Sequence, residues 1–137
     1  MNKQIERTLS IIKPDAVERN LESKIKEIFL KDNLNIIDSK KIKITKEEAE
    51  QFYKVHQSKP FYNDLCTYLS SGPIIVMILE GENVIIKNRE LMGATDPKNA
   101  SKGTIRNLYG ISIDKNSVHG SDSKENAKSE INFFFKG

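Results

Sequence analysis

An α+β fold is predicted by the order in which strand-like and helix-like segments follow one another in this 137-residue chain. Short apolar runs typical of strands are separated by segments in which apolar residues recur with the spacing of one helix side. No repeat, linker or low-complexity stretch divides the sequence, so residues 1–137 are expected to form a single domain. The segment order predicts a ferredoxin-like βαββαβ core with an inserted helical hairpin, a long loop and a C-terminal helix. In this plan the helices cover one face of an antiparallel sheet.

The first predicted strand covers residues 8–13, and Pro14 follows it. Side chains of a strand point alternately to its two faces. One face therefore carries Leu9, Ile11 and Lys13. Asn20 is placed to cap the next helix, because its side chain can accept a hydrogen bond from the first turn. That helix has an apolar stripe made of Leu21, Ile25, Ile28 and Phe29.

A turn at Asp32 and Asn33 leads into a second predicted strand over residues 34–44. Its apolar face carries Leu34, Ile36, Ile42 and Ile44. Thr45 and Glu48 then have the spacing of a capping box, which predicts the start of the hairpin's first helix. The apolar side of that helix, before the Pro60 that is expected to end it, carries Ala49, Phe52, Tyr53 and His56.

The second helix of the hairpin has an apolar side made of Tyr62, Leu65, Cys66 and Leu69. Residues 74–79 are apolar without alternation, which is typical of a strand buried on both faces. Asn83 is placed to cap a helix that runs to Met92, and Gly93 ends it. Residues 93–116 show little periodicity and predict a long loop, which in a compact domain tends to be functional.

The composition excludes several classes of protein. The net charge of +3 is mild, and the lysines are spread along the chain, whereas nucleic-acid binding usually needs a concentrated basic stripe. Cys66 is the single cysteine, so an internal disulfide framework and a Cys-rich zinc site are excluded. The longest apolar run is far too short to span a bilayer, and the N-terminus lacks an apolar signal core. A cytoplasmic protein without membrane contact is the simplest expectation.

Three cations follow strands or helix ends and are candidates for binding a polyphosphate: Lys13, Arg89 and Arg106. Arg89 lies on one helical stripe with Ile85 and Met92, so its stem should pack inward while its head reaches the helix edge. The alternative is that all three are ordinary side chains with apolar stems and solvated heads, and the spacing alone favours that alternative.

The strongest single candidate for chemistry is His119, at the end of a short predicted strand over residues 117–119. Asp122 and Glu125 resemble a capping box, so a helix is expected shortly after His119. Anions favour helix N-termini, so an anionic ligand could lie near this histidine. The apolar side of that helix carries Ala127, Ile131 and Phe134. A neutral imidazole is a usable nucleophile, and the carboxylate of Glu130 could hold one tautomer of it. A satisfied structural histidine is the alternative.

Several motifs, taken together and in order, closely resemble those of nucleoside diphosphate kinases. The resemblance covers nearly the whole chain, and the set is far more specific than any one piece. The matching segments are residues 8–17 (TLSIIKPDAV), 56–65 (HQSKPFYNDL), 71–73 (SGP), 92–97 (MGATDP), 103–106 (GTIR) and 116–123 (NSVHGSDS).

The resemblance implies that His119 is the residue that becomes phosphorylated. The catalytic set it implies is His119, Lys13, Tyr53 and Glu130, with the last two supporting the imidazole. The nucleotide-binding set it implies is Lys13, Phe61, Arg89, Thr95, Arg106 and Asn116. Within that set Phe61 would stack on the base, with Ile113 on its other face, and Asn116 and Lys13 would bind the sugar hydroxyls.

The implied reaction transfers the γ-phosphoryl group of ATP to nucleoside diphosphates by a ping-pong mechanism through a phosphohistidine, which maintains nucleoside triphosphate pools. By the same resemblance, Mg²⁺ arrives on the nucleotide phosphates and is not held by protein ligands. A homo-oligomer, either a hexamer or a tetramer, is also implied, with the long loop as a common subunit contact.

Three departures from the family pattern are Lys102 in place of a frequent proline, residues 107–109 (NLY) after Arg106, and Leu79 in place of a frequent tryptophan. They bear on the long loop and on subunit contacts, and none removes a residue of the two sets. Two other classes compete with an enzyme. A nucleic-acid-binding module of the same fold would need the aromatic strand motif that this chain lacks. A non-catalytic scaffold that binds nucleotides or partners would have no chemical need for all five of His119, Lys13, Arg89, Arg106 and Glu130.

Overall fold

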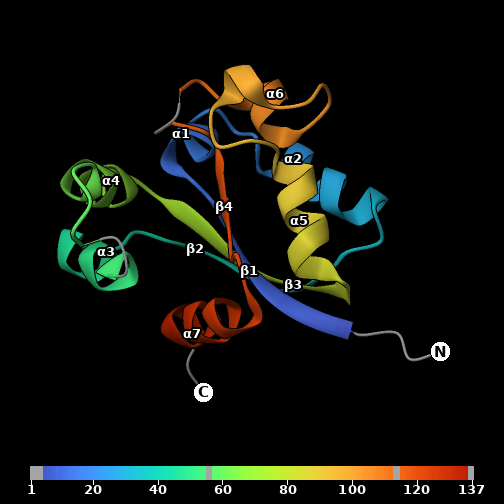
Figure 1. The fold of residues 1–137 in the computed structure, drawn as a ribbon, viewed down its shortest axis with the longest axis horizontal. Helices are drawn as coiled ribbons and strands as arrows, with labels where there is room; N and C mark the ends of the chain where they lie inside the picture. Colours follow the sequence, from blue (N-terminus) through green and yellow to red (C-terminus); the bar gives the residue numbers. More distant parts are fainter. Residues whose placement is uncertain (1–4, 55–56, 113–114, 136–137) are drawn as a thin grey trace.

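A four-stranded antiparallel sheet forms the centre of the computed structural model, which describes residues 5–54, 57–112 and 115–135 (Figure 1). The strands are β1 (Ile5–Ile12), β2 (Asn35–Ile42), β3 (Ile74–Glu82) and β4 (Val118–Gly120). They are ordered β2-β3-β1-β4, and every neighbouring pair is antiparallel. This order is the ferredoxin-like one, so the predicted fold class is confirmed.

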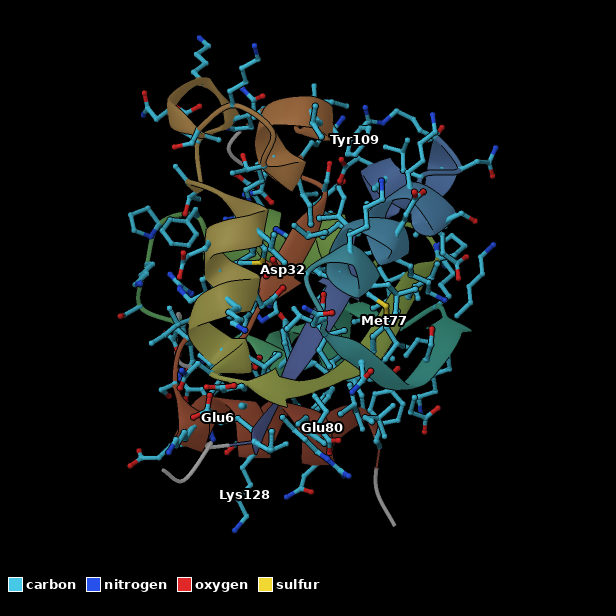
Figure 2. All side chains as sticks on the ribbon, turned by 90° about the vertical axis from the view of Figure 1, so that its right-hand side faces the viewer. Glu6, Asp32, Met77, Glu80, Tyr109 and Lys128 are labelled. Atoms are coloured by element: carbon cyan, nitrogen blue, oxygen red, sulfur yellow. The ribbon has the colours of Figure 1, made fainter. Side chains whose placement is uncertain are left out.

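The helices form two groups on opposite sides of the sheet, as Figure 1 shows for α2 and α5 against α3 and α4. Figure 2, viewed from the right of Figure 1, shows α2 and α5 in front of the strands. The helices are α1 (Pro14–Glu18), α2 (Glu22–Lys31), α3 (Lys46–Phe52), α4 (Tyr62–Leu69), α5 (Val84–Met92), α6 (Ile105–Tyr109) and α7 (Lys124–Phe134), with a 3₁₀ turn over Pro97–Asn99. The hairpin α3–α4 is inserted between β2 and β3.

The expectation that the helices cover one face of the sheet is wrong, because each face has its own buried cluster. β1 contributes Ile12 to the cluster under α2 and α5, and it contributes Leu9 and Ile11 to the cluster under α3 and α4. β3 is buried on both faces in the same way, which is why its apolar run lacks alternation. The inserted hairpin covers the face that a minimal βαββαβ unit would leave open.

The second strand differs from its prediction because of a β-bulge. Ile36 pairs with Leu79 and Asp38 pairs with Ile78, so Ile37 is an extra residue on β2. An extra residue reverses which face the following side chains occupy. The early residues Leu34 and Ile36 therefore pack in the α2–α5 cluster, whereas Ile42 and Ile44 pack in the α3–α4 cluster. They do not share the single face that alternation predicted.

Of the four predicted helix caps, only the capping box of α3 forms its side-chain hydrogen bonds as predicted. Thr45 and Glu48 form the capping box of α3. Asn83 is the N-cap residue of α5, whereas Asn20 lies one residue before the N-cap of α2. Both have positive φ angles, of 52° and 59°, and no side-chain cap hydrogen bond forms at either helix. α7 is capped by the side chain of Ser123, which accepts from Asn126 N, and not by Asp122.

The first hairpin helix is shorter than expected, because α3 ends at Phe52, well before Pro60. His56, predicted on its apolar side, lies outside the described residues. The long loop is also not structureless, since it contains the 3₁₀ turn and the five-residue helix α6. Elements this short cover too little of a helical period to be detected from sequence. Asn107, one of the departures, braces this segment: its Oδ1 accepts from Gly103 N at 3.1 Å.

None of the helices in the described ranges has the length and apolar content needed to cross a bilayer.

Candidate active site

A cleft of about 570 Å³ brings together residues that are far apart in the chain, from Lys13 to Glu130. All nine residues of the two predicted sets line it: Lys13, Tyr53, Phe61, Arg89, Thr95, Arg106, Asn116, His119 and Glu130. Six lining residues were not predicted from the sequence: Lys59, Leu65, Met92, Gly120, Asp122 and Asn126. Four of these, Lys59, Met92, Gly120 and Asp122, lie within three residues of a predicted site residue, so proximity to the motifs was the available signal. Leu65 and Asn126 each lie four residues from one, Phe61 and Glu130, and reach the cleft through their positions on α4 and α7.

The position of His119 follows from strand pairing. β4 pairs with β1 so that His119 lies opposite Ile11, on the sheet face covered by α3, α4 and the end of α7. Its Nε2 is 3.0 Å from Oε1 of Glu130, and the hydroxyl of Ser121 donates to the same oxygen at 2.8 Å. A carboxylate oxygen cannot donate, so the hydrogen-bond network assigns the proton to Nε2. In the neutral ring, Nδ1 therefore keeps its lone pair.

Two aromatic rings hold the imidazole from the side of α3. Phe52 and Tyr53 make edge contacts with the His119 ring at centroid distances of 5.3 and 6.2 Å. Burial, and secondly the nearby charge of Glu130, raise the pKa of Tyr53, so its hydroxyl stays protonated. Phe52 was predicted only as part of a helix face. Its adjacency to Tyr53 could not reveal this contact, because neighbouring residues on a helix point in different directions.

Lys13 lies at the end of β1, buried among polar partners of two loops. Its Nζ donates to Oδ1 of Asn116 at 2.9 Å, and Nδ2 of Asn116 donates to the carbonyl of Thr95 at 3.1 Å. The main-chain N–H of Lys13 also donates to the carbonyl of Ser117 at 2.8 Å. The strand end, the turn before β4 and the segment after α5 are therefore tied together at one side of the cleft.

Two arginines add positive charge to the same cleft. Arg106, on α6, is buried and donates to the carbonyls of Gly93 at 3.0 Å and Val118 at 2.9 Å. Burial, and secondly the positive charge of Arg89, lower the pKa of Arg106 to about 10, which leaves it protonated at neutral pH. Arg89 is exposed on α5, between the buried Ile85 and Met92 that the predicted stripe included. Sequence spacing could not decide whether these cations converge; the fold brings them to one cleft.

The α3–α4 hairpin supplies an exposed aromatic ring at the edge of the cleft. Phe61, the residue before α4, is 45% exposed, and Nζ of Lys59 lies 5.6 Å from its ring centroid. A flat, accessible ring of this kind can stack on a base. Ile113, expected on the base's other face, lies outside the described residues. Within the described ranges, His, Cys, Asp and Glu side chains form no group of three or more that could hold a metal ion.

The family model described as "Nucleoside diphosphate kinase" matches residues 6–137 of this chain. A nucleoside diphosphate kinase of Campylobacter hominis is 59% identical over 133 residues, which is 97% of each chain. One of Persephonella marina is 55% identical over 131 residues, covering 96% of this chain and 94% of that protein.

Solved structures agree with the sequence relatives. The orthorhombic crystal form of the Aquifex aeolicus nucleoside diphosphate kinase has a TM-score of 0.96 and 41% identity, covering 98% of this chain and 97% of that one. The apo crystal structure of the Encephalitozoon cuniculi enzyme has a TM-score of 0.93 and 39% identity, covering 96% and 90%.

Proposed function

The chain belongs to the nucleoside diphosphate kinase family, and we propose that His119 carries the phosphoryl group in the transfer from ATP to nucleoside diphosphates that this family catalyses. One observation carries the proposal. The Nε2 side of the imidazole is held by Glu130, and the ring lines the same cleft as Lys13, Arg89 and Arg106. A nucleophile with a fixed tautomer among converging cations is what in-line transfer of an anionic phosphoryl group needs.

The first half-reaction follows from that arrangement. Nδ1 of His119 forms a bond to the γ-phosphorus of ATP, and the bond from that phosphorus to the bridging oxygen breaks as ADP leaves. Glu130 accepts a hydrogen bond from the Nε2–H group throughout, and its carboxylate stabilises the ring as the ring becomes positive. In the second half-reaction a terminal oxygen of the incoming diphosphate attacks the phosphorus, and the N–P bond breaks. The two halves make a ping-pong cycle at one site.

The cations would act on the phosphates. Lys13, Arg89 and Arg106 can each donate hydrogen bonds to phosphate oxygens and stabilise the charge on the group in transit, which is most of what a protein contributes to this step. Thr95, exposed beside them, would add a hydroxyl donor. Tyr53, whose hydroxyl stays protonated, would support the imidazole.

The nucleoside would lie toward the hairpin. Phe61 would stack on the base, and Asn116 with Lys13 would bind the sugar hydroxyls. Because every base has a π-face, stacking discriminates weakly between bases. We therefore expect broad nucleotide specificity and a role in maintaining nucleoside triphosphate pools.

Magnesium would enter with the substrate. Mg²⁺ prefers oxygen ligands, keeps several waters and is commonly held through substrate phosphates. The donor set of this cleft, rich in cations, fits the phosphates of a Mg²⁺–nucleotide complex better than a bare ion. Mg²⁺ would thus be part of the substrate, neutralising charge on the β- and γ-oxygens.

The assembly and location are also proposals. We infer a homo-oligomer, a hexamer or a tetramer, that acts in the cytoplasm on free nucleotides, without membrane or specific nucleic-acid partners. Leu108 and Ile111 support the oligomer, since both are more than half exposed on the segment between α5 and β4. Sedimentation velocity and cell fractionation would test the two statements.

The reaction is tested by incubating the protein with γ-labelled ATP and Mg²⁺. We expect an acid-labile, base-stable label on His119 that moves to added nucleoside diphosphates. The variant His119→Ala should take no label and transfer nothing, while still binding nucleotide. A label on another residue, or comparable turnover in the variant, would refute the mechanism.

A further inference from the structure

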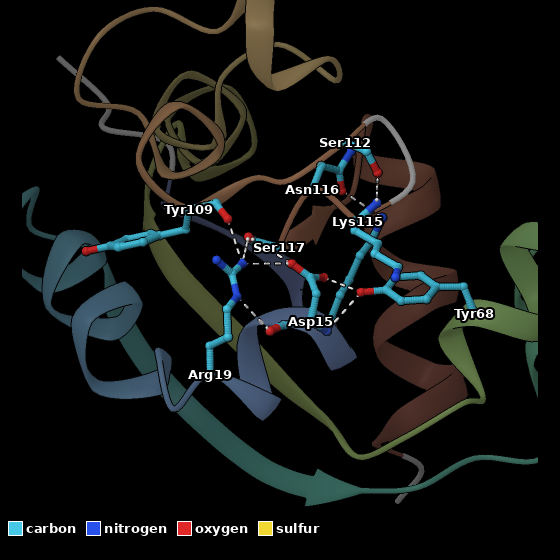
Figure 3. Close-up of polar contacts among 9 residues, drawn as sticks. Asp15, Arg19, Tyr68, Tyr109, Ser112, Lys115, Asn116 and Ser117 are labelled. Carbon is cyan, nitrogen blue, oxygen red and sulfur yellow. Dashed lines mark hydrogen bonds and ion pairs between the residues drawn. The ribbon is translucent and has the colours of Figure 1, made fainter.

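A buried carboxylate, Asp15, lies at the start of α1, and Figure 3 shows its contacts with Arg19, Tyr68 and Ser117. The side chain of Asp15 is 4% exposed. Its Oδ1 accepts from the hydroxyl of Tyr68, and its Oδ2 accepts from the hydroxyl of Ser117 at 3.2 Å and from Nη2 of Arg19 at 3.1 Å. The main-chain N–H of Asp15 also donates to the Tyr68 oxygen at 2.8 Å. A buried charge is tolerated only when it is satisfied in this way, so these partners hold one another in place.

Two of the partners, Tyr68 and Ser117, come from segments that also supply residues of the cleft. Tyr68 belongs to α4, the helix that starts directly after Phe61. Ser117 lies in the turn before β4, the strand of the histidine. Arg19 reaches further, because its Nη2 also donates to the carbonyl of Tyr109 at the end of α6, the helix of the buried arginine. One carboxylate therefore connects three parts of the site without touching the cleft.

The turn at Ser117 is a conformation that needs support. Ser117 has a φ of 75°, and the N–H of Val118 donates to the carbonyl of Asn116 at 2.9 Å, two residues back. Such a tight turn with a positive central φ is rare and strained for a residue other than glycine. It directs the Asn116 side chain to Nζ of Lys13. The hydrogen bond from the Ser117 hydroxyl to Asp15 is thus part of what keeps this turn in place.

We propose that Asp15 is a positioning residue for phosphoryl transfer, holding the Ser117 turn and α4 in the geometry that the reaction requires. The inference rests on the proposed function of the cleft. Its two routes should be separable. Through Ser117, Asp15 fixes the residues that precede the histidine, so losing that bond should lower kcat. Through Tyr68, it fixes α4, the helix that begins directly after Phe61. Losing that bond should therefore raise the KM for nucleotides.

Three variants test the proposal by steady-state kinetics with MgATP and a nucleoside diphosphate. Asp15→Asn keeps the shape but places an NH₂ where one accepting oxygen was, and we expect kcat/KM to fall about tenfold to a hundredfold. Ser117→Ala should lower kcat, and Tyr68→Phe should raise KM, each by roughly threefold to tenfold, as expected for one hydrogen bond. Glu18→Gln is the matched control, because it removes an exposed carboxylate from the same helix. It should behave like the parent.

Each outcome decides the question. An Asp15→Asn variant within about twofold of the parent in kcat/KM would overturn the proposal. If that variant does not fold, parental kcat and KM in both hydroxyl variants would overturn it instead. If kcat falls and KM rises together in every variant, in proportion to a lower Tm, Asp15 has a purely structural role. That result would also contradict the proposal. Labelling of the parent at His119 separates this result from failure of the proposed function, which would leave the parent unlabelled.

Discussion

The two sides of the cleft are built in different ways. The histidine side, made of β4 with the facing residues of α6 and α7, has its functional groups already bonded to one another. His119 and Glu130 are 20% and 19% exposed in their side chains, and Ser121 donates to the same carboxylate. The hairpin side, α4 with the preceding Phe61, presents that ring, which is 45% exposed. The first side is organised before any ligand arrives, whereas the second offers a surface that a nucleoside would cover.

This difference matches the two demands of the reaction. Transfer of a charged group is accelerated by dipoles and charges that are already oriented when the transition state forms. Binding a variety of bases needs only a flat ring at the right distance. Substitutions on the histidine side should therefore act mainly on kcat, and substitutions on the hairpin side mainly on KM. Four variants, from the largest expected effect to the smallest, test this contrast.

Arg106→Ala should have the largest effect on the histidine side, seen as a fall in kcat. It removes a charge that, in the proposed mechanism, would lie beside the transferring group, and it leaves the carbonyls of Gly93 and Val118 without these donors. We expect kcat to fall about a hundredfold to a thousandfold, or roughly 2.7–4 kcal/mol, if the guanidinium acts as one preorganised donor. Single-turnover labelling of His119 measures the step directly. Arg106→Lys is the comparison, because it keeps the positive charge but loses the paired N–H donors of the guanidinium. If Arg106→Ala reacted at the parent's rate, Arg106 would have no part in the mechanism.

Phe61→Ala should affect the hairpin side, and should change KM more than kcat. Losing the stacking surface should weaken nucleotide binding by about 1–3 kcal/mol and raise KM, with kcat changed much less. Phe61→Tyr keeps a ring and serves as the control. A large fall in kcat with an unchanged KM would mean that the hairpin takes part in transfer and would end the contrast between the two sides.

Gly120→Ala probes how tightly β4 is packed behind the histidine. A Cβ at Gly120 would collide with Nδ2 of Asn88 and lie 2.9 Å from Sδ of Met92. We expect a loss of about 1–3 kcal/mol in the free energy of unfolding, together with reduced kcat, because overpacking displaces the strand. Asn88 is fully buried, and its amide atoms have no partner among the described residues.

The double variant Asn88→Ala/Gly120→Ala should therefore recover much of both losses, because it removes the amide that collides with the new Cβ. Urea unfolding and kcat, measured on the single and double variants, check this. If the double variant is no better than Gly120→Ala alone, the amide is not what limits the space at Gly120.

Thr45→Ala should have the smallest effect and should be confined to the hairpin. It removes the hydroxyl that accepts from Glu48 N in the capping box of α3. The expected loss is about 1 kcal/mol of unfolding free energy, with kcat near the parent's value. Thr45→Ser keeps the cap and is the matched control. A marked fall in kcat would show that the start of α3 is coupled to the imidazole through Phe52 and Tyr53.

Much of the fold was predictable because local chemistry marks it. The capping box of α3, the helix over Val84–Met92 and the two-faced run of β3 follow from spacing and composition. The β2 bulge and the short helix α6 did not, since one extra residue or a single helical turn leaves no periodic signal. The positive φ angles of Asn20 and Asn83 were not predictable, because asparagine serves both side-chain caps and left-handed backbone turns.

The sequence by itself determined the parts of the site: one histidine before a helix, three cations near element ends, and a serial order of strands and helices that specifies the sheet. Only the tertiary structure decided how these parts meet. Glu130 reaches His119 because α7 packs back on β1, and Asp15 meets Ser117 across more than a hundred residues because β1 and β4 pair. Such contacts depend on chain topology and on burial of two apolar faces, which local spacing does not encode.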